Sequence, residues 1–126
     1  QNGTIYIPPK DAIFDFVDAV LKHKVKLAYS LLAESYAIGE NTFALLSVLY
    51  NNAKAVLQVQ TCESSDISKS TGLTGWQIKC AKDKTGYYTD KQLIHILRTV
   101  QKVESGIKSG QIDEPIAVEY VLAQIF

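Results

Sequence analysis

The segment NTFALLSVLYNNAKAVLQVQ, residues 41–60, is the longest stretch in which apolar side chains recur at helical spacing without a proline or a glycine. Its apolar residues follow the period of a helix and not that of a strand. They are Leu45, Val48, Leu49, Ala53, Val56 and Leu57. Leu46, Tyr50 and Val59 make the apolar stripe wider than a surface helix needs. We therefore predict a core helix, about 30 Å long, against which the other helices pack.

The composition indicates one soluble domain. A chain of 126 residues can bury roughly two-thirds of the surface that its unfolded form exposes. Its 13 Lys and Arg residues balance its 13 Asp and Glu residues, so no overall charge attracts the domain to nucleic acid or to anionic lipid. No segment approaches the roughly 20 consecutive apolar residues of a membrane helix. We expect a cytoplasmic domain without a membrane contact.

The sequence offers no recognisable motif for catalysis or metal binding. Cys62 and Cys80 lack the CxxC spacing of a zinc or redox site, so we expect two reduced thiols. No phosphate-binding loop, GxSxG motif or HExxH motif is present, and His23 and His95 lie far apart in the sequence. We therefore expect no enzymatic activity, catalytic residue, metal or cofactor in this chain.

The two ends of the sequence differ in character. Residues 1–10 contain Gly3 and the Pro8-Pro9 pair, so we predict an arm or interdomain linker there. Residues 11–126 are predicted to form one helical domain. Because the chain begins at Gln1 and contains no methionine, we expect it to be part of a longer protein.

Two helices are predicted before the core helix. The first begins at Asp11, and its carboxylates at positions 11, 15 and 18 share one face, which we interpret as solvated rather than as a cation site. The second runs from about Lys24 to Tyr36, and its predicted inward residues are Leu27, Ala28, Leu31, Leu32 and, as a further candidate, Tyr36. Gly39 is a candidate for the left-handed residue that ends it.

Capping residues mark the next boundaries. Asn41 or Thr42 can cap the core helix, so we expect the first three helices to form a short-looped antiparallel array. After residue 60 the sequence becomes polar, and Ser64 or Ser65 can cap a short helix there.

Two short helices are predicted at residues 65–70 and 74–82, and together they resemble a helix-turn-helix. In a DNA-binding motif of this kind the second helix would present Gln77, Lys79 and Lys82 to the major groove. Neighbouring carboxylates nearly balance the lysines, however, whereas nucleic-acid modules usually carry a basic excess. A nucleic-acid-binding module is therefore the alternative function. We expect Trp76 to be a core or interface anchor.

The last part of the chain completes an all-α fold. A second long helix is predicted over residues 90–109, where Gly106 weakens one turn by roughly 1 kcal/mol relative to alanine. A final, strongly apolar helix is predicted over residues 116–126, with Asp113 as its cap and Pro115 in its first turn. The expected fold is an antiparallel helical bundle of about six to seven helices.

The order and spacing of several segments resemble the C-terminal domain of the delta subunit of bacterial DNA polymerase III. DISKSTGLTGWQIKCA, residues 66–81, resembles that family's I-x-K-x-x-G-L-x-x-W/F-x-x-K segment, and VESGIKSGQI, residues 103–112, resembles its E-x-x-I/L-K-x-G-x-I stretch. Further matching segments are IFDFVDAVLKHK at 13–24, A-YSLL at 28–32, GEN--ALL at 39–46 and VLQVQ at 56–60. The resemblance extends from Ile13 to Phe126.

This resemblance implies a collar domain of the clamp loader, the assembly that places the sliding clamp on primed DNA. In that family the domain is a helical bundle that packs beside the equivalent domains of neighbouring subunits. The expected partners are subunits of the gamma/tau and delta-prime type. The parent subunit would hydrolyse no ATP, and the sliding clamp would be contacted through an N-terminal part that this sequence lacks.

Apolar residues near the end of the chain exceed what one helix face can bury, so some are expected to contact a neighbouring subunit. A pair of aromatic residues before the second long helix is a second candidate patch. The predicted interface residues are Tyr120, Val121, Ile125 and Phe126 in the first set, and Tyr87 and Tyr88 in the second.

Overall fold

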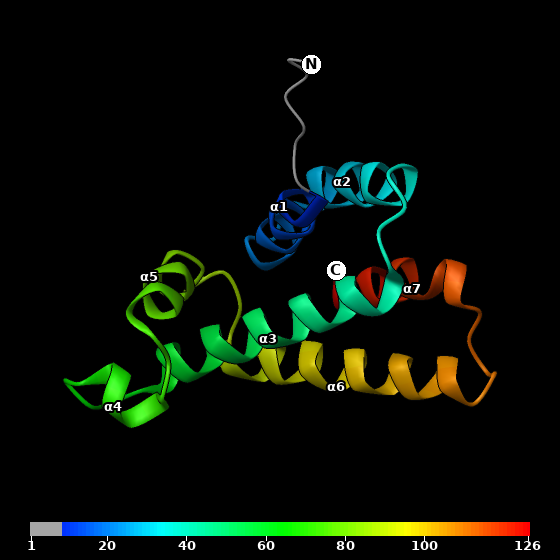
Figure 1. Cartoon of the computed structure of the whole chain (residues 1–126). Helices are drawn as coiled ribbons and strands as arrows, with labels where there is room; N and C mark the ends of the chain where they lie inside the picture. The colour runs from blue at the N-terminus through cyan, green and yellow to red at the C-terminus, as the bar shows by residue number, and fades with distance from the viewer. Residues whose placement is uncertain (1–8) are drawn as a thin grey trace, which may run out of the picture.

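The computed structural model describes residues 9–126, and within this range the chain forms seven α-helices and one short 3-10 helix, with no β-strand (Figure 1). The predicted all-α fold is therefore confirmed. The α-helices are α1 (Pro9–Leu21), α2 (Val25–Ala37), α3 (Thr42–Thr61), α4 (Ile67–Thr71), α5 (Gly75–Asp83), α6 (Asp90–Lys108) and α7 (Ala117–Ile125), and the 3-10 helix η1 spans Glu114–Ile116.

Helix α3 is the core helix that the sequence predicts. The side chain of Asn41 caps its first turn by accepting hydrogen bonds from the backbone amides of Phe43 at 2.8 Å and Ala44 at 3.2 Å. Helices α1, α5, α6 and α7 all pack against α3, and α6 runs alongside it (Figure 1). The inward residues of α3 are almost completely buried; they are Leu45, Leu46, Leu49, Ala53 and Val56.

Helix α1 begins before the predicted start at Asp11, so Pro9 and Lys10 are helical and only residues 1–8 of the predicted arm lie outside the described residues. The helix ends before His23, whose backbone φ of 57° lies in the left-handed region. Lys24 N then donates to Ala19 O at 2.9 Å, a bond that satisfies carbonyls at a helix C-terminus. A histidine thus occupies a position that usually favours glycine.

Helix α2 packs mainly on α1 and covers little of α3. The predicted antiparallel succession of three neighbouring helices is therefore wrong for the α2 and α3 pair. The prediction that Leu27 faces inward is also wrong, because only one side of α2 is covered and Leu27 is exposed. Ala28 and Leu32 make the buried side of this helix.

The polar segment forms the two predicted short helices. Asp66, and not the predicted Ser64 or Ser65, caps α4. The Ser64 hydroxyl instead accepts a hydrogen bond from the backbone amide of Asp66, and the helix begins after this turn. Thr74 caps α5 with a complete capping box, in which the Gln77 side chain bonds back to the Thr74 amide. The boundaries of α5 are therefore fixed by local sequence.

Helices α6 and α7 are joined by a tight turn around Gly110, whose φ is 80°. Asp113 lies at the start of η1 as predicted but makes no side-chain capping bond, and α7 begins only at Ala117. Gly106 lies under the side chain of Ile112: a Cβ atom there would lie only 2.6 Å from Ile112 Cδ1. This glycine allows the turn to fold back on α6.

Candidate protein-binding surfaces

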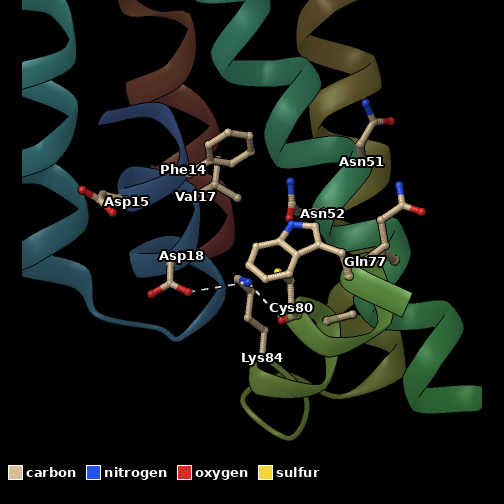
Figure 2. Close-up of a pocket in the computed structure, with 12 residues that line it drawn as sticks. Phe14, Asp15, Val17, Asp18, Asn51, Asn52, Gln77, Cys80 and Lys84 are labelled. Atoms are coloured by element: carbon tan, nitrogen blue, oxygen red, sulfur yellow. Dashed lines mark hydrogen bonds and ion pairs between the residues drawn. The ribbon is translucent and has the colours of Figure 1, made fainter. Parts of the chain in front are cut away.

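A hollow lies between α1, α3 and α5, and we call it the α1/α3/α5 groove (Figure 2). Its volume is about 520 Å³, within the range of pockets that bind small ligands or single side chains. Its lining residues are Phe14, Asp15, Val17 and Asp18 from α1, Asn51, Asn52 and Ala55 from α3, Trp76, Gln77, Cys80 and Ala81 from α5, and Lys84 after α5.

Two aromatic side chains border this groove without being covered by the rest of the domain. Trp76 is 71% exposed and Phe14 is 51% exposed. Val17 and Ala81 also line the groove; both are buried and give it an apolar floor. The prediction that Trp76 is a core or interface anchor is thus wrong for the core. An exposed tryptophan beside an apolar hollow is typical of a binding hot spot.

An ion-pair network beside the groove connects α1 to the end of α5. Figure 2 shows one of its pairs, Asp18 with Lys84. The Asp18 carboxylate forms ion pairs with Lys22 Nζ at 3.3 Å and with Lys84 Nζ at 3.6 Å. Lys22 Nζ also pairs with the Asp83 carboxylate at 2.8 Å. The hydrogen bond from Lys22 lowers the pKa of Asp83, and the bond to Asp83 raises the pKa of Lys22 against the opposing effect of desolvation. On the predicted acidic face, Asp15 is exposed, and Asp18 keeps 38% of its side chain exposed while it pairs with Lys22 and Lys84.

Two amide side chains in the groove each use one end for a local bond. Asn52 Nδ2 donates to Val48 O at 2.8 Å, and Gln77 Oε1 accepts from Thr74 N at 2.9 Å. Among the described residues, Asn52 Oδ1 and Gln77 Nε2 have no hydrogen-bond partner. The groove therefore offers one acceptor and one donor group beside its apolar floor.

A smaller hollow of about 200 Å³ lies between α6 and α7. Tyr120 is 40% exposed and borders it, together with the cationic side chains Arg98 and Lys102. His95 Nε2 lies 3.1 Å from Gln124 O and connects the two helices. We call Tyr120, His95, Arg98, Lys102 and Gln124 the α6–α7 surface. It combines residue types that are enriched at interface hot spots.

The structure separates the predicted interface residues into exposed and buried ones. Tyr87 and Tyr120 are exposed. The expectation that Tyr88 and Val121 are available to a partner is wrong, because both side chains are buried in the core. Tyr88 Oη donates a hydrogen bond to Val20 O at 2.7 Å, and burial raises the pKa of Tyr88 to about 12.

The aromatic residue at the end of the described chain is half-buried, as is Ile125 before it. The ring of Phe126 meets the rings of His23 and Tyr29 edge-on, with centroid distances of 5.4 Å and 6.1 Å. His23 also meets the Tyr88 ring, at 5.6 Å. We call His23, Tyr88 and Phe126 the aromatic clasp. It joins the end of α1, the start of α6 and the end of α7.

The residues predicted to contact DNA do not form one surface. Gln77 lines the α1/α3/α5 groove and is held by the capping box, whereas Lys79 and Lys82 are exposed outside it. The Lys79 ammonium lies 6.0 Å from the centre of the Trp76 ring. All three side chains are exposed, and nucleic-acid binding through them stays a prediction.

The rest of the described surface gives no sign of other chemistry. No three His, Cys, Asp or Glu side chains in residues 9–126 come together as a metal site. In the same residues, no helix combines the length and the apolar character needed to cross a membrane. Both cysteines are free thiols.

A family model described as the C-terminal domain of the DNA polymerase III delta subunit matches residues 10–125. The fold is similar to that of the Bacillus subtilis DNA clamp loader delta protein, with a TM-score of 0.79 at 16% sequence identity. The match covers 98% of this chain and 38% of that protein, so the chain corresponds to well under half of the relative's length. No curated protein matches the sequence. Because the family model covers almost the whole described chain, this protein belongs to the family of C-terminal domains of DNA polymerase III delta subunits.

Proposed function

We propose that this domain is the collar module of a clamp-loader delta subunit, which associates with neighbouring subunits and so supports loading of the sliding clamp onto primed DNA. The observation that carries the proposal is the family match over residues 10–125. The parent protein would act in the cytoplasm and would be a subunit without ATPase activity. Its partners would be subunits of the gamma/tau and delta-prime type. The sliding clamp would be contacted by another part of the parent protein.

Within this proposal, the α6–α7 surface is the contact with a neighbouring subunit. Tyr120 supplies an exposed aromatic ring on the open side of α7, whose other side is buried in the core. Arg98 and Lys102 supply two positive charges beside it. Such a surface is complementary to an apolar patch bordered by carboxylates. Tyr87 lies in the segment between α5 and α6 and is a second contact candidate.

The proposal can be tested by mixing the chain with clamp-loader subunits of the same organism and measuring complex masses by size-exclusion chromatography with light scattering. We expect co-elution with the subunits. Replacing Tyr120 by serine or Arg98 by glutamate should weaken association about tenfold or more, because truncated hot-spot residues commonly have effects of this size.

Lys91→Glu is the matched control, because it reverses a charge on the same helix at an exposed position outside the α6–α7 surface. This variant should associate normally. A short DNA duplex, measured in parallel at low and high salt, tests the alternative function. Salt-sensitive binding to the duplex without association to any clamp-loader protein would overturn the collar proposal.

A further inference from the structure

The α1/α3/α5 groove has the features of a binding site that the α6–α7 surface does not account for. Its aromatic border, formed by Phe14 and Trp76, remains largely exposed in the folded domain. Helices α1, α3 and α5 supply its walls, so the groove is held by packed elements and not by a loop (Figure 2). A large apolar side chain inserted between these rings would remove apolar surface of all three side chains from water.

The charges at the groove restrict what can bind. The lining contains two carboxylates, Asp15 and Asp18, and one ammonium group, Lys84. Asp18 and Lys84 belong to the network with Lys22 and Asp83, whose formal charges cancel, so the unbalanced charge of the lining is that of Asp15. Lys84 is already engaged, because its Nζ donates to Cys80 O at 3.0 Å and lies 3.6 Å from Asp18. Asp15 has no ion-pair partner among the described residues. The groove is therefore complementary to a neutral or basic ligand and not to an acidic one.

The hydrogen-bonding groups indicate a peptide backbone. Asn52 Oδ1 can accept and Gln77 Nε2 can donate, because the other end of each amide is occupied by a bond to the domain's own backbone. One acceptor and one donor match the N–H and C=O of an extended main chain. The local bonds also fix both side chains in place, which reduces the entropy lost on binding.

We propose that the α1/α3/α5 groove binds an extended peptide segment of another protein, in which a bulky apolar residue enters between Phe14 and Trp76 and an adjacent Lys or Arg faces Asp15. The peptide's main chain bonds to Asn52 and Gln77. This site is separate from the α6–α7 surface and does not depend on the function proposed for it.

The test uses a library of random dodecapeptides displayed on phage, selected against the immobilised chain. Enriched peptides should share a bulky apolar residue beside a basic one. Because Trp76 is the only tryptophan of the chain, synthetic copies of these peptides should shift its fluorescence to shorter wavelength in a saturable way as the ring leaves water.

Variants decide whether the peptides use the groove. Trp76→Ala should weaken binding about tenfold or more, and Asn52→Leu should weaken it by a smaller factor. Tyr29→Ala is the matched control, because it removes an exposed aromatic ring that lies on α2, outside the groove, and should leave binding unchanged. Circular dichroism checks that each variant is folded. Failure to enrich peptides, enrichment of acidic ones, or full binding to folded Trp76→Ala would overturn the proposal.

Discussion

The aromatic clasp and the α1/α3/α5 groove both depend on aromatic side chains, but they use them in opposite ways. In the clasp, Tyr88 is 6% exposed and its hydroxyl donates a hydrogen bond to Val20 O. The domain therefore buries the ring and also provides the hydroxyl with a hydrogen-bond partner. In the groove, Trp76 is 71% exposed and covers little of the core. The difference separates residues that stabilise the fold from residues that remain available for a partner.

The largest expected effect comes from deleting the clasp's tyrosine. Tyr88→Ala should lower the free energy of unfolding by about 3–5 kcal/mol, because it leaves a cavity in the core and removes the hydroxyl's hydrogen bond to Val20 O, which keeps only its bond from His23 N. Trp76→Ala should change it by only about 0.5 kcal/mol, as for most surface substitutions. Urea denaturation followed by circular dichroism measures both, and equal losses would remove the distinction between the two sites.

The second prediction concerns the hydroxyl group of Tyr88 and pH. Its pKa of about 12 in the folded protein lies above the value of about 10 expected in the unfolded chain. Stability should therefore be intact below pH 10 and fall by up to roughly 2–3 kcal/mol as the pH rises toward 12. Tyr88→Phe removes this contribution, so its stability should decline less steeply over that range. If the unfolding free energies of the unsubstituted chain and of Tyr88→Phe fell equally between pH 10 and pH 12, the Tyr88 hydroxyl would not be buried in the folded protein.

A smaller effect is expected at His23, where two requirements compete. Its left-handed φ favours glycine, whereas its ring packs on Phe126 and Tyr88. His23→Ala loses the ring contacts and keeps the backbone strain, but His23→Gly relieves the strain. We expect the glycine variant to be more stable than the alanine variant by about 1 kcal/mol in thermal and urea unfolding. The reverse order would mean that the backbone conformation contributes little.

The smallest effect is expected at the ion-pair network beside the groove. Asp18 is partly exposed, so water and salt screen its contacts with Lys22 and Lys84. Asp18→Asn should cost about 0.5 kcal/mol in dilute buffer and less at high salt. A loss that did not depend on salt would indicate packing rather than charge as the role of this side chain.

The sequence was informative where local rules decide the structure. The spacing of apolar residues predicted α3, and Asn41 and Thr74 predicted two helix starts that the structure confirms. Those predictions succeed because periodicity and capping depend on residues within one or two turns. The resemblance to the delta-subunit family was also visible in the order of the segments, and the family match confirms it.

Long-range packing was not visible in the sequence. Tyr87 and Tyr88 are adjacent in a turn, where no period tells which ring is buried, and the partner of Tyr88 is Val20 on a distant helix. Gly106 was interpreted only as a weak point of α6, and the close approach of the Ile112 side chain to it was not foreseen. The groove combines side chains from three helices, so its aromatic border could not be recognised before those helices were placed together.

We propose that the buried Tyr88 stabilises this domain and that the exposed Tyr120 contacts a neighbouring subunit. Hydroxyl-radical footprinting of the chain alone and within an assembled clamp loader tests it directly, because oxidation reports the solvent exposure of each side chain. We predict that Tyr120 reacts in the free chain and becomes protected in the assembly, whereas Tyr88 is unreactive in both. Equal reactivity of Tyr120 in the two states, with the assembly intact, would contradict the account.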